Sequence, residues 1–152
     1  KENINEEYLD IFSKNDIKRF NDYGRFYRSI AFFYNTDLDL CTVRNYNSRP
    51  KQMIDDVLQS FQKKEQSFNE QDIEKLLNNT IELMKILKEN PNREYLIDAC
   101  IPFSLSSWDI LISNIAKIIQ DVEMKNTFEK SKATTSNVNK RVEIINKLLK
   151  GC

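Results

Sequence analysis

Histidine is absent from this chain of 152 residues, and the chain has only two glycines, Gly24 and Gly151. Without imidazole there can be no Ser-His-Asp or Cys-His catalytic set and no zinc site that contains histidine. Two isolated glycines cannot form the glycine-rich loops that hold nucleotide phosphates. We therefore expect a protein that is not an enzyme and that has no catalytic residue, metal site or cofactor.

Cysteine is also scarce, because the chain has only Cys41, Cys100 and Cys152, which are far apart in the sequence. A small secreted domain held by disulfides normally has an even and denser set. No uncharged apolar run is long enough to cross a bilayer as a helix. We expect an intracellular, cytoplasmic protein without a membrane span. The Asn-x-Thr triplet at Asn78 leaves a secreted helical effector as an alternative.

Charge of one sign is not in excess, since 23 basic residues balance 23 acidic ones. This balance argues against a general polyanion-binding protein. The charges are unevenly distributed: residues 125–150 contain seven basic and two acidic side chains, and residues 55–98 contain ten acidic and six basic ones. The basic segment could form a face that binds nucleic acid, or it could pack beside the acidic middle helix. The second interpretation is favoured, because the two blocks are nearly complementary.

Apolar residues recur at three-to-four-residue spacing along nearly the whole chain, which is typical of amphipathic helices. The length fits one domain, residues 1–152. We predict an all-α bundle of five to seven short amphipathic helices around a central apolar helix at about 107–124. The expected helices cover about 5–12, 15–33, 50–61, 70–89, 93–101, 107–124 and 138–149.

Two segments depart from this periodicity. Residues 35–49 alternate only briefly between polar and apolar side chains, and they are interpreted as an irregular surface crossover without a strand partner. Residues 130–137 are predominantly polar and are expected to form a mobile loop before the last helix.

Large aromatic side chains are more numerous than short helices can easily bury, and some stand beside arginines. Such residues can line a groove that accepts an amphipathic helix of another protein. We therefore predict a protein-binding adaptor, and the candidate contact residues are Arg25, Phe26, Arg28, Phe32 and Phe61. Against this stands the simpler interpretation that the helical spacing places most of these rings in the core.

An RNA-associated scaffold is the alternative function. Rings that stack on bases and cations that contact phosphates are the mixture that single-stranded nucleic acids require. The candidate nucleic-acid contacts are Arg19 in the aromatic helix and Lys140, Arg141 and Lys147 in the last helix.

Two short patterns resemble known families. The sequence Asp22-Tyr23-Gly24-Arg25, followed by 30–33, resembles the Asn-Trp-Gly-Arg motif of the apoptosis-regulating B-cell-lymphoma family. That resemblance implies a helical groove in which Arg25 pairs with an aspartate of the bound helix. Residues 72–73, 93–95 and 108–112 resemble the helical domain of the second-step pre-mRNA splicing factor, over about 50–149. The two families are incompatible and match equally, so neither is assigned.

Overall fold

The computed structural model describes residues 21–46, 48, 50–63 and 69–150. Within these residues the chain is mostly helical, which confirms the predicted all-α bundle. The helices are α3 (Asn21–Asn35), α4 (Pro50–Lys63), α5 (Glu70–Ile86), α6 (Arg93–Cys100), the short 3-10 helix η1 (Ile101–Phe103), α7 (Trp108–Ser113), α8 (Ile115–Gln120), α9 (Val122–Asn126) and α10 (Thr135–Lys150). The predicted helix at 5–12 lies outside the described residues. No described helix has both the length and the apolar character that a membrane span requires.

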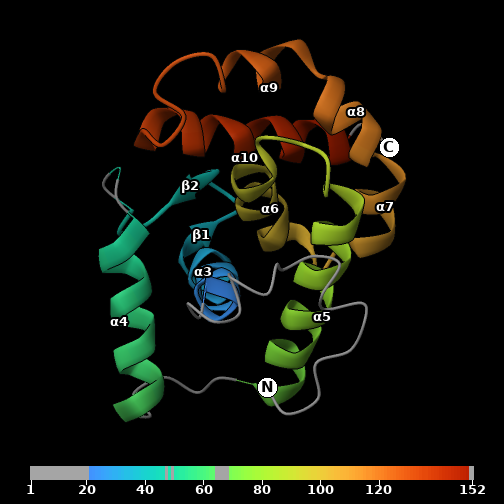
Figure 1. Cartoon of the computed structure of the whole chain (residues 1–152). Helices are drawn as coiled ribbons and strands as arrows, with labels where there is room; N and C mark the ends of the chain where they lie inside the picture. The colour runs from blue at the N-terminus through green and yellow to red at the C-terminus, as the bar shows by residue number, and fades with distance from the viewer. Residues whose placement is uncertain (1–20, 47, 49, 64–68, 151–152) are drawn as a thin grey trace.

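Helix α3 is viewed nearly end-on at the centre of Figure 1, with α4 and α5 on either side and α10 across the top. Helix α6 appears between α3 and α10 in this view, and it contacts α3, α5 and α10. Every residue from Leu96 to Ser104 is buried, so α6 beyond its first turn forms an unbroken buried segment with η1. A helix that is buried on all sides occupies the centre of a domain. The central helix of this bundle is therefore α6.

The prediction of one central helix over 107–124 is wrong. The segment consists of α7, α8 and α9, and it lies at the edge of the bundle (Figure 1). Asn114 separates α7 from α8, and its side-chain amide donates to the carbonyl of Ile110 (2.8 Å). Asp121 is extended and caps α9 by accepting from the amide of Met124 (2.9 Å). Short polar side chains of this kind compete with the backbone hydrogen bonds of a helix.

Residues 35–49, which the sequence predicts as an irregular crossover without a strand partner, contain a small antiparallel hairpin. Strand β1 (Thr36–Asp37) pairs with β2 (Thr42–Val43), so each short strand finds its partner within the segment. The side chain of Asp37 accepts from the amides of Asp39 and Leu40 and stabilises the turn between the strands. The amide of Val43 donates to the side chain of Asn139 in α10 (2.9 Å), which fixes the hairpin on the last helix.

The polar loop predicted at 130–137 is shorter in the structure, because α10 begins at Thr135. The side-chain amide of Asn137 donates to the carbonyls of Lys130 and Ser131, both at 3.0 Å. The hydroxyl of Tyr46 donates to the carbonyl of Ala133 (2.7 Å). These bonds hold the segment between α9 and α10 against the hairpin side of the bundle.

A comparison of two isoleucines tests which helix is central. Ile97→Ala in α6 removes a fully buried side chain and should lower the free energy of unfolding by about 2–5 kcal/mol. Ile110→Ala in α7 changes a side chain that is 44% exposed and should cost less than about 1 kcal/mol. Urea unfolding followed by circular dichroism measures both. Equal losses, or a larger loss for Ile110→Ala, would contradict the central position of α6.

Candidate functional site

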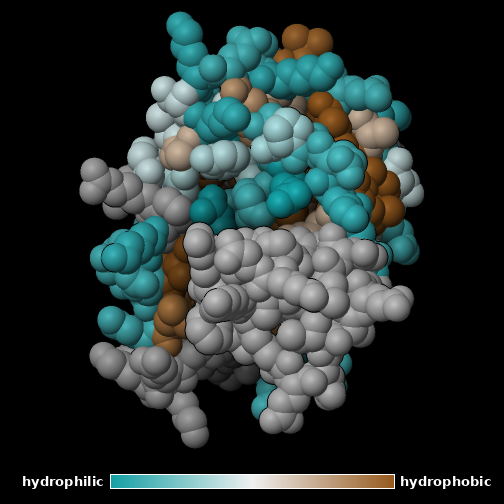
Figure 2. All heavy atoms as spheres, in the orientation of Figure 1, coloured by the Kyte–Doolittle hydropathy of each residue, from teal (hydrophilic) through white to brown (hydrophobic). Residues whose placement is uncertain are grey.

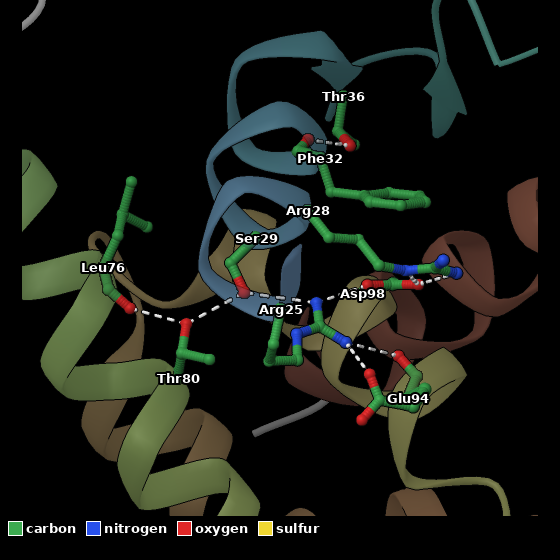
Figure 3. Close-up of polar contacts among 9 residues, drawn as sticks. All are labelled: Arg25, Arg28, Ser29, Phe32, Thr36, Leu76, Thr80, Glu94 and Asp98. Atoms are coloured by element: carbon green, nitrogen blue, oxygen red, sulfur yellow. Dashed lines mark hydrogen bonds and ion pairs between the residues drawn. The ribbon is translucent and has the colours of Figure 1, made fainter. Parts of the chain in front are cut away.

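The buried carboxylate of Asp98 in α6 binds two arginines of α3 (Figure 3). Arg25 donates from Nη2 to Oδ1 (2.5 Å), and Arg28 donates from Nε to Oδ2 (2.6 Å). Arg25 also donates from Nη1 to the carboxylate of Glu94 (2.7 Å). Buried charges are tolerated when they are paired in this way. Burial opposes the charge of Arg28, but the attraction to Asp98 outweighs it, and the pKa of Arg28 is raised.

A chain of hydroxyl groups extends this cluster to α5. Arg25 donates to the hydroxyl of Ser29 (3.2 Å), which lies 2.9 Å from the hydroxyl of Thr80. Thr80 in turn donates to the carbonyl of Leu76, one helical turn earlier (2.7 Å). Figure 3 shows that the chain runs from the guanidinium to the backbone of α5. The polar cluster thus joins α3, α5 and α6.

A third arginine, Arg141 of α10, is buried between aromatic rings. Its guanidinium carbon lies 4.3 Å from the ring centre of Phe128 and 5.0 Å from that of Tyr95, which are cation-π distances. Its Nε and Nη2 donate to the side chain and carbonyl of Thr127, both at 2.9 Å. Burial lowers the pKa of Arg141 to about 10, which leaves it a cation at neutral pH. The ring of Tyr95 also lies 5.9 Å from the guanidinium of Arg28, so it stands between the two cations.

These contacts correct the predicted partner-binding residues. Arg25 is 3% exposed and Phe32 is fully buried, so neither can contact a partner in this fold. The aspartate that Arg25 binds is Asp98 of the same chain, in place of the ligand aspartate that the B-cell-lymphoma resemblance implied. Phe26 is half-buried against the core, and the side chain of Arg28 is 21% exposed. The side chain of Phe61 lies outside the described part of the structure.

The predicted nucleic-acid residues do not form a free basic face. Arg141 is buried, and Lys140 and Lys147 both pair with Glu143, at 3.6 and 3.1 Å. The hydrogen bond with Lys147 lowers the pKa of Glu143, and the same contact raises the pKa of Lys147. Lys140 and Lys147 thus share a single carboxylate, and α10 keeps more positive than negative charge while it packs against α6. Arg19 lies outside the described residues.

Two observations bear on metal binding and on thiol chemistry among the described residues. No group of three or more cysteine and carboxylate residues within the described ranges is placed to hold a metal ion. Cys100 is completely buried, and burial raises the pKa of its thiol to about 12. Such a thiol is uncharged at neutral pH and is not a nucleophile.

An exposed apolar surface lies where the end of α5 meets α8. An open depression of about 530 Å³ is lined by Ile86, Pro91 and Ile119. Leu87 and the polar residues Lys85, Lys88, Glu89 and Asn90 complete its lining. Ile86 is 42% exposed. In the short helices on either side of α8, Ile110 of α7 is 44% exposed and Val122 of α9 is 72% exposed. Figure 2 shows exposed apolar side chains along the α7 and α8 edge of the molecule. We call Ile86, Pro91, Ile110, Ile119 and Val122 the apolar surface.

Sequence reasoning missed the apolar surface because it placed the segment 107–124 at the centre of the bundle. Two signals in the sequence could have located it. Asn114 and Asp121 interrupt the apolar pattern with side chains that break helices. Ile110 lies off the stripe formed by Leu111, Ile115 and Ile118, so a helix buried on one face leaves it exposed.

Comparisons of the chain with known protein families, with curated proteins and with solved structures give no match.

Two carboxamide variants test whether Asp98 holds the bundle together. Asp98→Asn removes the charge that binds Arg25 and Arg28, and it should lower the free energy of unfolding by about 3–5 kcal/mol because the buried Arg25 keeps only Glu94 and Arg28 loses its carboxylate. Glu82→Gln is the matched control, since Glu82 makes an exposed pair with Lys85 at 3.4 Å that should contribute less than about 1 kcal/mol. Chemical denaturation measures both. An Asp98→Asn loss no greater than the control would show that the cluster is dispensable.

Proposed function

We propose that the protein is a non-enzymatic binding module that recognises another protein through the apolar surface. The observation that supports this proposal is the exposure of the most apolar segment of the chain. Its residues Ile110 and Val122 lie 44% and 72% exposed, and Ile119 lines the depression beside Ile86. Apolar residues that gather in one depression, as Ile86, Pro91 and Ile119 do, are a feature of interaction sites.

Scattered exposed apolar residues are ordinary, and Leu40 is an example. Leu40 is 72% exposed at the turn of the hairpin, where no described cavity adjoins it. The apolar surface differs at Ile86, Pro91 and Ile119, because these side chains line one depression between the end of α5 and α8. Complete burial of one valine or isoleucine contributes about 1.5–3 kcal/mol. Covering several partly exposed side chains can therefore stabilise a complex by a few kcal/mol before the entropy cost of association.

The depression fits one or two large apolar side chains of a partner. It is wide open and short, because it is bounded by the end of α5 on one side and by the six-residue helix α8 on the other. An amphipathic helix that presents apolar residues at three-to-four spacing is the partner element we favour. The RNA alternative has less support, because Arg141 is buried and Lys140 and Lys147 both pair with Glu143.

Replacement of exposed residues by glutamine tests the proposal. Ile86→Gln and Val122→Gln should leave the helical content and the thermal midpoint nearly unchanged, because both side chains are well exposed. Proteins captured from a lysate of the source cells by the wild-type chain should be lost with these two variants. Leu40→Gln is the control, since it removes an equally exposed apolar residue outside the apolar surface. Retention of the same proteins by all three variants would contradict the proposal.

A further inference from the structure

The rim of the depression carries more positive than negative charge. Lys85, Lys88 and Glu89 line it directly. Arg93 is held at the rim because its Nη1 donates to the carbonyl of Lys88 (2.9 Å). Lys132 reaches the same loop by donating from Nζ to the side chain of Asn92 (2.9 Å). Glu82 already pairs with Lys85, and Glu89 is the one carboxylate among the residues that line the depression.

The end of helix α5 does not cancel this positive charge. The carbonyls at a helix C-terminus carry partial negative charge when they lack hydrogen-bond donors. Here the carbonyls of Lys85 and Leu87 accept from the amides of Lys88 and Asn90, at 3.4 and 2.9 Å. The carbonyl of Lys88 accepts from Arg93. The ammonium of Lys88, which is exposed, is left to interact with an incoming ligand.

We propose that the partner binds through an acidic segment that carries a large apolar side chain. This inference rests on the proposed function and specifies the chemistry of the partner. The apolar side chain enters the depression between Ile86, Pro91 and Ile119. Carboxylates beside it in the partner sequence interact with Lys88, Arg93 and Lys132. Complementary charges at the rim of an interface contribute mainly to specificity and to the rate of association.

Charge also argues against two other occupants. In a symmetric dimer the same patch would face itself, which would bring Lys88 and Lys132 toward their copies. A nucleic acid would be attracted by the cations but has no large apolar side chain to fill the depression, and Glu89 would repel its phosphates. An acidic protein segment with a large apolar side chain complements both the apolar residues that line the depression and the basic residues at its rim.

Selection from a random peptide display library tests the inference even while the natural partner is unidentified. The immobilised targets are the wild-type chain and the Ile86→Gln variant. Peptides enriched on the wild-type chain should have a net negative charge and at least one large apolar residue, and Ile86→Gln should abolish their enrichment. The affinity of a selected peptide should fall about tenfold in Lys88→Glu/Lys132→Glu, which reverses two charges near the bound segment.

The control for this charge reversal is Lys51→Glu/Lys75→Glu, in which two exposed lysines of α4 and α5 are reversed away from the depression. Its peptide affinity should remain within about twofold of the wild-type value. Enrichment of neutral or basic peptides that still depend on Ile86 would overturn the acidic partner and leave the binding function standing. Equal enrichment on both immobilised targets would overturn both proposals.

Discussion

The shared carboxylate of Asp98 is the interaction on which the arrangement of this bundle depends. A carboxylate in a buried helix is unfavourable unless cations and hydrogen-bond donors replace the lost water. Arg25 and Arg28 supply them from adjacent turns of α3, so α3 must lie against α6 with one orientation. The hydroxyl chain through Ser29 and Thr80 then positions α5 on the same cluster. Polar groups that must all be satisfied specify geometry more strictly than apolar packing does.

The central position of α6 explains why an apolar surface is left at the edge. Helix α6 and η1 fill the interior with an unbroken buried segment, and α10 packs across them. The chain that follows η1 can therefore contact the core along one side only. Between 107 and 124 the buried apolar residues are Leu111, Ile118 and Met124, and Ile110 and Val122 are left exposed. The proposed binding function thus follows from the same packing that makes α6 central.

Periodicity is sufficient to predict the helical class and the positions of α4, α5, α6 and α10 to within a few residues. It cannot distinguish a buried arginine from a solvated one, because the carboxylate that binds Arg25 is 73 residues away in the sequence. For this reason the sequence pattern alone assigns the candidate contact residues of α3 to the surface. The same limitation applies to Arg141, whose partners Tyr95 and Phe128 come from two other segments.

The error over 107–124 has a different physical origin. The overall apolar character of a segment does not show how deeply it is buried in the bundle. In addition, Asn114 and Asp121 divide this segment into helices of five or six residues. Helices this short gain little from their own hydrogen bonds and are stabilised by the surface against which they pack. In this bundle they pack on the outside of the core around α6.

Native-state hydrogen exchange across the whole chain is the measurement that tests this account most directly. The account predicts that amides in the buried turns of α6 and α3 exchange slowest, and only through global unfolding. Amides of α7 and α9 should exchange faster, through local opening at lower free energy. Slowest exchange in α7, α8 and α9, with early opening of α6, would contradict the central role of Asp98 and its helix.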